Sequence, residues 1–226
     1  MFPIFATIIT PDHGPVYAET DFTKAIVEPV NTATTLLFLI ISVYWIIKIW
    51  KNRKEHKFLF YSLSVLLLGG VGGVLYHALR SSFVFHILDE SPISLLCFAV
   101  CCYFYFRAFK IWWPPILTIG SAIVLCLLIV LFVPWTIMTN LIYIVLSIAV
   151  IIPIIILLYK TKLQNSSYFF LCMIFFAGAV FFRSVDSLKW TPVGTHFLWH
   201  ILGACAVFFL IQYVYMTDLC FTQLKE

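Results

Sequence analysis

The chain has 226 residues, of which 63% are hydrophobic and only 11% are charged. Soluble globular domains carry about 25% charged residues, so this composition excludes a water-soluble enzyme, a disordered chain and a small secreted disulfide protein. It predicts an all-α membrane protein, because a spanning helix needs about 20 apolar residues and the chain has material for roughly seven. The net charge of +4 is then a topology signal and gives no reason to expect nucleic-acid binding.

Seven apolar segments follow one another with short connections, as in a helix bundle. They predict a single seven-transmembrane domain over residues 1–226, with an extramembrane N-terminal segment at 1–24 and a short cytosolic tail at 216–226. The expected spans are Ala25–Trp50, Phe58–Tyr76, Ile87–Phe109, Pro115–Val133, Met138–Tyr159, Tyr168–Ser187 and Thr195–Tyr215.

The distribution of lysine and arginine predicts the orientation of this bundle. Ten of the 14 basic residues lie on the side that holds the first, third and fifth loops and the C-terminus. The positive-inside rule then puts the C-terminus in the cytosol and the N-terminus outside or in a lumen. The basic run 51–57 is interpreted as a topology anchor, with a lipid-headgroup site as the less favoured alternative. We expect a bacterial inner membrane or a eukaryotic ER or Golgi membrane, with the active site on the periplasmic or lumenal side.

Ionisable side chains inside the spans are costly in hydrocarbon and therefore need an explanation. The order of the spans predicts that eight of them gather at the outer or lumenal end of the bundle. Two of the eight, Arg183 and Asp186, are three residues apart and are expected to form a local salt bridge. His86, just before the third span, is expected to have a solvated or packing role. The eight are Glu28, His77, Asp89, Glu90, Arg183, Asp186, His196 and His200.

The most informative pair is His196 and His200, because residues four apart lie on one face of a helix. Two imidazoles at this spacing can reach one metal ion, as in the HExxH helix of metalloproteases. His77 is the best candidate for a third ligand, which would complete the three-ligand, one-water arrangement of catalytic zinc. Asp89 could accept a proton from that water or orient it. The alternative for each histidine alone is a structural hydrogen bond.

Four segments of the chain resemble the alkaline ceramidases. These enzymes belong to a wider superfamily of seven-span metal hydrolases, which also includes the progestin and adipoQ receptors and a GPI-lipid remodelling branch. The matching segments cover spans one, two, three and seven in the expected order. They are Glu28–Thr32, Tyr76–His77, Ile87–Pro92 and Gly194–Leu202.

The resemblance implies a zinc site formed by His77, His196, His200 and a water molecule, with Asp89 in contact with that water. It also implies a calcium ion near the start of the first span. Glu28 matches one calcium ligand of the family, and Glu19 and Asp21 supply the hard oxygen ligands that calcium prefers. A solvated acidic turn is an equally favoured interpretation of these three carboxylates.

One position departs from the family pattern. The family has a serine four residues before the first histidine, which the resemblance assigns to polarising the scissile carbonyl, whereas this chain has Gly73. An oxyanion donor is typically worth about 10²–10³ in rate. Another donor could substitute, the substrate could differ, or hydrolysis could be weak. The glycine run 69–73 could also allow spans to approach closely. The spacing from His77 to Asp89 is one residue longer than the family leads us to expect.

Three functions are compared at this point. The leading hypothesis is a membrane-embedded zinc hydrolase of a linear amide in a lipid such as ceramide or a related N-acyl lipid. The second is a receptor or sensor with structural zinc and little turnover. The third, an ion or proton transporter, is least favoured, because the other spans lack a central carboxylate or histidine and the chain shows no internal repeat. The sequence gives no usable signal of oligomeric state.

Overall fold

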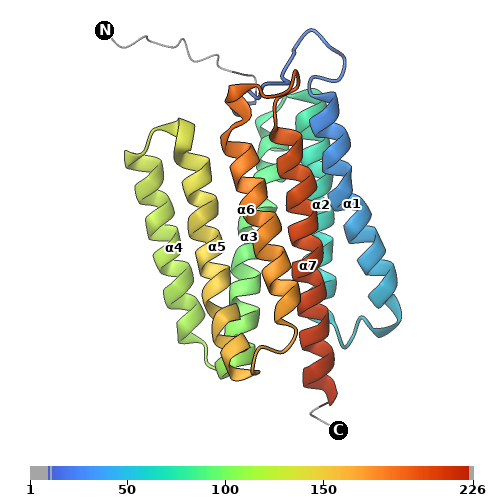
Figure 1. The fold of residues 1–226 in the computed structure, drawn as a ribbon, viewed down its shortest axis with the longest axis vertical. Coiled ribbons are helices and arrows are strands. Elements are labelled where there is room, and N and C mark those ends of the chain that lie inside the picture. Colours follow the sequence, from blue (N-terminus) through green and yellow to red (C-terminus); the bar gives the residue numbers. More distant parts are fainter. Residues whose placement is uncertain (1–9, 11, 224–226) are drawn as a thin grey trace.

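The computed structural model describes residue 10 and residues 12–223, and these residues form seven α-helices and two short 3-10 helices, with no strand. All seven α-helices are long and apolar enough to span a membrane, which confirms the predicted fold class. The helices stand side by side, and the segment before α1 lies at the upper end of the bundle in Figure 1. The elements are α1 (Pro29–Ile49), η1 (Trp50–Asn52), α2 (Lys57–Leu79), α3 (Phe83–Phe109), α4 (Trp113–Phe132), α5 (Trp135–Lys160), α6 (Ser166–Ser184), η2 (Asp186–Leu188) and α7 (His196–Gln223).

Two helices, α3 and α7, extend beyond the predicted spans by four residues or more. Helix α3 begins at Phe83, because the Ser82 side chain accepts a hydrogen bond from the Val84 N–H and caps the helix. His86 therefore lies inside the helix and not in a loop, and its ring stacks on Tyr76, which agrees with a packing role. Helix α7 continues to residue 223, so most of the expected tail at 216–226 is helical, and residues 224–226 lie outside the described part.

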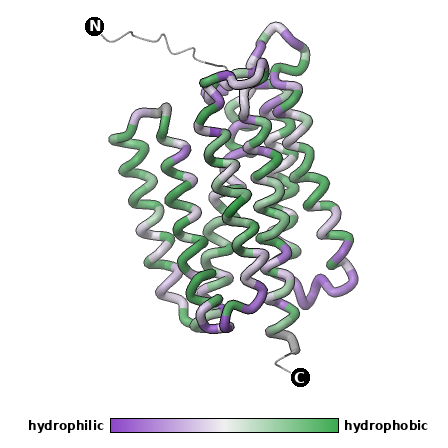
Figure 2. The backbone as a smooth tube through the Cα atoms, in the orientation of Figure 1, coloured by the Kyte–Doolittle hydropathy of each residue, from purple (hydrophilic) through white to green (hydrophobic). Residues whose placement is uncertain are grey.

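The outside of the bundle is suited to lipid. Hydrophobic residues follow the middle of the helices and hydrophilic residues gather at the two ends (Figure 2). Large apolar side chains such as Ile47, Leu131 and Phe132 are exposed on the surface, and apolar patches of this extent indicate a membrane-facing surface. The buried core lies between the helices and includes Trp45, Leu63, Phe104 and Tyr213 among its largest members.

Glycines allow α2 and α3 to approach closely. A Cβ on Gly72 would lie only 2.5 Å from the backbone of Leu88 in α3, so a side chain there would force the two helices apart. A Cβ on Gly69 would touch Pro92 of the same helix. Close approach of this kind is the usual role of small residues between spanning helices. It brings Asp89, the neighbour of Leu88, against α2.

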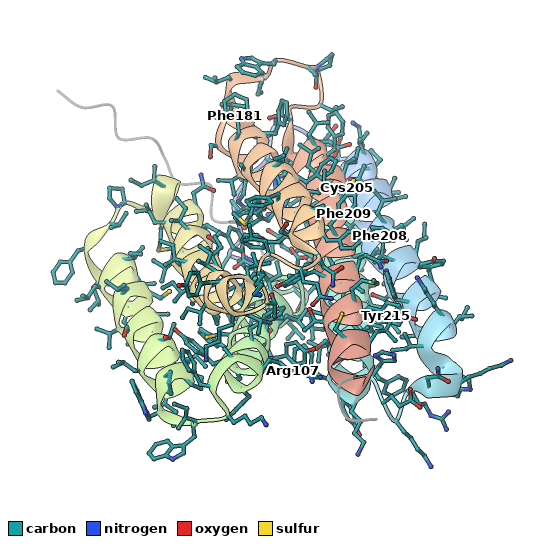
Figure 3. All side chains as sticks on the ribbon, turned by 60° about the horizontal axis from the view of Figure 1, so that its bottom comes forward. Arg107, Phe181, Cys205, Phe208, Phe209 and Tyr215 are labelled. Carbon is teal, nitrogen blue, oxygen red and sulfur yellow. The ribbon has the colours of Figure 1, made fainter. Side chains whose placement is uncertain are left out.

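A polar cluster lies where α2 begins and where α3 and α7 end, and we call its members, His56, Tyr103, Arg107 and Asp218, the opposite-end cluster. Arg107 is partly exposed, and the other three are buried. This end of the bundle is the lower one in Figure 1. The Asp218 carboxylate accepts hydrogen bonds from the Tyr103 hydroxyl at 2.6 Å and the His56 Nδ1 at 3.1 Å. It also pairs with Arg107. Figure 3, turned to bring this end forward, shows Arg107 beside the lower part of α7. The opposite-end cluster thus joins α2, α3 and α7.

Candidate metal centre

Three histidines meet at the upper end of the bundle, where α2 ends and α7 begins. His77, His196 and His200 are each less than 5% exposed, and one ring nitrogen of each lies within 4.8 Å of the others. Within residues 10 and 12–223, this histidine cluster is the one group of three or more histidine, cysteine or acidic residues with ligand atoms so close together. The predicted convergence of the three histidines is confirmed, and the cluster could hold a metal ion.

The hydrogen bonds around the histidine cluster leave nitrogen atoms free for a metal. His77 donates its Nδ1–H to the acceptor-only carboxylate of Glu28 at 2.6 Å. The Nδ1 of His200 lies 3.0 Å from the Thr34 hydroxyl and 3.2 Å from the Thr35 hydroxyl. Both hydroxyls donate to carbonyls of α1, so they accept from His200. The Nε2 atoms of these two imidazoles are then lone-pair donors, which is the form that binds zinc.

The third imidazole adds to this fit. His196 Nδ1 is buried and has no hydrogen-bond partner among the described residues. One ring nitrogen of His196 lies within 4.8 Å of a ring nitrogen of His77 and of one of His200, so this imidazole can supply a third ligand atom. A set of three neutral imidazoles suits zinc, which prefers nitrogen and sulfur ligands and leaves a fourth position open in catalytic sites. The residues present therefore fit the metal that the sequence predicts.

Asp186 fixes the start of α7. One of its carboxylate oxygens accepts the backbone N–H groups of Thr195 and His196 at 2.7 and 2.9 Å. The other accepts the N–H of Ala18 at 2.9 Å. A carboxylate at a helix N-terminus satisfies orphan N–H groups and interacts favourably with the helix dipole. Gly194, at φ +73°, leaves room for this cap, because a Cβ there would collide with Asp186. The cap sets the position of His196.

The expected local salt bridge between Arg183 and Asp186 is wrong. Both carboxylate oxygens of Asp186 accept hydrogen bonds from backbone N–H groups, and no ion pair joins Asp186 to Arg183. The Arg183 guanidinium instead lies 5.1 Å above the ring of Tyr143 and 5.3 Å above that of Trp199. It is also close enough to the Tyr17 side chain to interact with it. The short separation of Arg183 and Asp186 in the sequence does not lead to an ion pair. Asp186 instead accepts three backbone N–H groups, two of them at the start of α7.

Tyr17 covers the histidine cluster from the N-terminal segment. Its ring stacks on His196 with centroids 3.7 Å apart and an angle of 25°, and it lies 5.6 Å from the ring of His77. Burial raises the pKa of the Tyr17 hydroxyl, so this group is a proton donor at neutral pH. Sequence reasoning missed Tyr17, because a single tyrosine in a mixed polar segment carries no pattern that points to a site.

An ion-pair network supports Glu28. One oxygen of Glu28 pairs with Arg80 and accepts from Thr20, while the other accepts from His77. Arg80 also pairs with Asp12, and all three charged side chains are almost completely buried. Burial alone would raise the pKa of Glu28, but its hydrogen bond with His77 and the positive charge of Arg80 hold that pKa below its usual value. The sequence alone assigns no role to Arg80 or to Asp12.

Asp89 lies beside α2 at the level expected. A Cβ built on Gly73, one helical turn before His77, would lie 2.5 Å from the Asp89 Oδ1 and 2.7 Å from the Thr35 Cγ2. The Asp89 carboxylate therefore occupies the space that a side chain at position 73 would need. A serine at position 73 would have to displace the ends of the Asp89 and Thr35 side chains. The catalytic role of Asp89 stays a prediction.

A largely apolar cavity of about 250 Å³ extends from this end into the bundle. Thr35 and Asp89 line it near the histidine cluster, and Phe58 and Val214 line it towards the opposite end. Along α7 its lining runs from Trp199 to Val214, a separation of fifteen residues, which is about 22 Å at a helical rise of about 1.5 Å per residue. The length and the apolar lining of the cavity suit a hydrocarbon chain.

The three carboxylates expected to bind calcium do not form a group of ligands in the described structure. Both oxygens of Glu19 accept backbone N–H groups of Val30 and Asn31 at the start of α1. Asp21 is partly exposed and accepts from Thr23. Glu28 is engaged by Arg80 and His77 as above. This geometry does not fit a calcium site, and calcium binding stays a prediction from the resemblance.

Comparison with known proteins agrees with the geometry of the site. A comparison with curated proteins finds no match. The model of the family described as Ceramidase matches residues 17–226, which include the histidine cluster, Asp89 and Glu28. This match covers nearly the whole chain, from Tyr17 above the cluster through α7. The seven-helix membrane protein with three buried, converging histidines therefore belongs to the ceramidase family.

Proposed function

We propose that the chain is a membrane-embedded, zinc-dependent hydrolase that cleaves the amide bond of ceramide or a related N-acyl lipid. The observation that carries this proposal is the position of the histidine cluster beside a long apolar cavity, with the Asp89 carboxylate lining that cavity. A polar centre that binds metal and an apolar space that accepts a hydrocarbon chain are the two things that lipid-amide hydrolysis requires.

His77, His196 and His200 would hold the zinc ion through one nitrogen each. A bound zinc ion supplies Lewis acidity, which activates water near neutral pH and polarises a carbonyl. The protein's own contribution is to keep the imidazoles in the correct tautomer and orientation. Glu28 does so for His77, and the hydroxyls of Thr34 and Thr35 do so for His200.

Asp89 is the proposed general base. Its carboxylate would accept the proton of the attacking water and then deliver a proton to the amine that leaves, so that the proton count balances over the reaction. Within the part of the chain that the structure describes, no hydrogen bond or ion pair engages the Asp89 carboxylate, and Gly73 leaves it room against α2.

Tyr17 and Arg183 are the proposed replacement for the family serine. The Tyr17 ring lies directly over His196, and Arg183 interacts with it from α6. A phenol and a guanidinium are both hydrogen-bond donors, and donors aimed at developing negative charge are typically worth about 10²–10³ in rate each. Of the three outcomes left open by Gly73, this proposal takes the first: another donor substitutes.

The orientation follows from the distribution of basic residues. Nine of the 13 lysine and arginine residues that the structure describes belong to the end opposite the histidine cluster, so the cluster would face the periplasm or a lumen. A lipid would reach it from the outer or lumenal leaflet, with its chain in the apolar cavity. The alternative function is a receptor or sensor with structural zinc. The one observation that favours it is that position 73 is a glycine and not the serine of the family.

The test is hydrolysis by the purified protein. We expect release of fatty acid from ceramide or from another member of a panel of N-acyl lipids, and we expect a zinc chelator to abolish it. If a protein that retains zinc releases no fatty acid from any lipid of a broad panel, the proposed hydrolase activity is contradicted. The receptor or sensor is then the favoured function.

A further inference from the structure

Arg80 lies at the end of α2 and turns back towards the histidine cluster. It is the C-cap residue of that helix, its backbone N–H donates to the Tyr76 carbonyl, and its φ of +48° is in the left-handed region. Residues other than glycine and asparagine seldom adopt this conformation, so the surroundings must hold Arg80 in it. Arg80 follows His77 by three residues and so lies on the same side of α2.

The guanidinium of Arg80 is buried and its donors are all used. Its Nε and one Nη donate to Asp12, and that Nη also donates to the Pro15 carbonyl at 2.8 Å. The other Nη pairs with Glu28 and lies 3.4 Å from the Thr20 hydroxyl. Arg80 is 1% exposed and the two carboxylates are 0% exposed. Burial disfavours its charge, but the two carboxylates outweigh this and raise its pKa.

This arrangement links the N-terminal segment to a metal ligand. Asp12 belongs to that segment, Arg80 joins it to Glu28, and Glu28 accepts the Nδ1–H of His77. The backbone adds to the link, because the N–H of Glu28 donates to the carbonyl of His77. A planar guanidinium suits this task, since its fork can bind two carboxylates in fixed directions.

The two buried carboxylates that bind Arg80 would have no positive partner there if Arg80 were absent. One of them would then have to take up a proton, or a cation would have to bind in its place. Calcium is the partner that the family resemblance leads us to expect, yet Glu28 offers no free oxygen to it. Asn31 Oδ1 is the nearby buried oxygen with no hydrogen-bond partner, and it would be a ligand if a cation did bind.

We propose that Arg80 does with its own side chain what a second metal ion would do: it holds Glu28 in place against His77. This inference rests on the zinc site of the proposed function and makes Arg80 a positioning residue. It follows that the site needs zinc alone. It also follows that Arg80 keeps Tyr17 over the histidine cluster, since the segment that carries Tyr17 is tied down by Asp12 and the Pro15 carbonyl.

The test measures zinc binding and not hydrolysis. Zinc affinity of the purified full chain is determined by competition with a chromophoric chelator, and the visible spectrum of the cobalt-loaded protein reports the ligand geometry. Arg80→Gly removes the guanidinium without straining the left-handed backbone. We expect it to weaken zinc binding by about 10- to 100-fold and to change the cobalt spectrum. Added propylguanidinium should restore both. The zinc affinity of Arg80→Lys should lie between those of wild type and Arg80→Gly, because a lysine carries the charge but lacks the forked guanidinium.

Two controls accompany these variants. Arg107→Ala breaks an arginine–carboxylate pair at the other end of the bundle and should leave zinc affinity unchanged. Calcium added to calcium-stripped wild type should also leave the zinc affinity and the cobalt spectrum unchanged. If Arg80→Gly does not fold, the zinc affinity of Arg80→Lys and the calcium titration of wild type test the inference in its place.

Wild-type zinc affinity in Arg80→Gly, or a wild type whose zinc affinity responds to calcium, would overturn the inference. A wild type that binds no zinc would overturn it together with the proposed function. A wild type that binds zinc tightly but cleaves no lipid would overturn the proposed function alone.

Discussion

The two ends of the bundle both bury histidine beside a carboxylate and an arginine, yet they differ in what is left unsatisfied. In the opposite-end cluster one histidine, His56, pairs with Asp218, which also binds Tyr103 and Arg107. At the other end, three imidazoles converge, and His196 Nδ1 has no partner among the described residues. The first arrangement is complete, whereas the second has nitrogen atoms to offer.

This difference separates a structural polar cluster from a site. Buried charge alone does not mark function, because a satisfied ion pair can simply join helices. The signs of a site are converging atoms with unused lone pairs, supporting groups that fix their orientation, and adjoining space for a ligand. The histidine cluster has all three, since the apolar cavity begins beside it at Thr35 and Asp89. The opposite-end cluster serves to hold α2, α3 and α7 together.

The largest expected effect comes from removing a metal ligand. His200→Ala should abolish hydrolysis, with a loss of at least about 10³-fold, because zinc would lose one of three protein ligands. His56→Ala removes a buried histidine from the opposite-end cluster and should keep most of the activity. Fatty-acid release from ceramide measures both, and thermal unfolding in detergent shows that each variant is folded. Equal losses in the two variants would contradict the distinction between the ends.

The next effect is expected at Asp89. Asp89→Asn preserves the size of the side chain but removes the base, so hydrolysis should fall by about 10²–10⁴-fold. Zinc content should stay at the wild-type level, because Asp89 is not one of the three proposed ligands. Metal analysis and hydrolysis assays on the same preparation check this. A variant that loses zinc along with activity would instead make Asp89 a metal ligand, as the receptor or sensor with a closed metal shell requires.

The opposite-end cluster should contribute to stability. Asp218→Asn removes the charge of the carboxylate that pairs with Arg107 and His56, next to the buried His56 and Tyr103 side chains, and we expect a loss of about 3 kcal/mol of unfolding free energy. The change is measured as a lower thermal unfolding midpoint. Zinc affinity of the folded protein should not change. A drop in zinc affinity without a drop in stability would show that the two ends are coupled.

The smallest effect is expected at Gly73. Gly73→Ser restores the family residue, but its Cβ would lie 2.5 Å from the Asp89 Oδ1 and displace that carboxylate. A base moved out of place by a fraction of an ångström works less well, so we expect hydrolysis to fall by about tenfold. The kcat and KM for ceramide provide the measurement. An increase in kcat would mean that the missing serine, and not Tyr17 with Arg183, is the donor that the site needs.

The sequence predicts the fold and the histidine cluster well. Membrane spans are predictable because lipid demands apolar helices of fixed length, and the alternation of span direction puts His77, His196 and His200 at one end. The spacing of His196 and His200 and the paired glycines near His77 are local patterns of helix geometry. Spacing of this kind along a helix can be recognised from one sequence.

The sequence does not predict how the segment before α1 folds over the site. Asp12, Tyr17 and Arg80 make contacts across more than fifty residues or between unrelated segments, and these depend on the packed structure. The pairing of Arg183 and Asp186 fails for a similar reason: capping α7 and holding Ala18 compete successfully for the Asp186 oxygens. Long-range competition for hydrogen-bond acceptors is not visible in residue spacing.

Zinc stoichiometry tests the central claim most directly. Metal analysis of purified wild type, His196→Ala and His56→Ala compares a proposed ligand with the buried histidine of the opposite-end cluster. We predict one zinc ion per chain in wild type and in His56→Ala, and none in His196→Ala. Zinc retained by a folded His196→Ala protein, or absent from the wild type, would contradict a metal centre built by His77, His196 and His200.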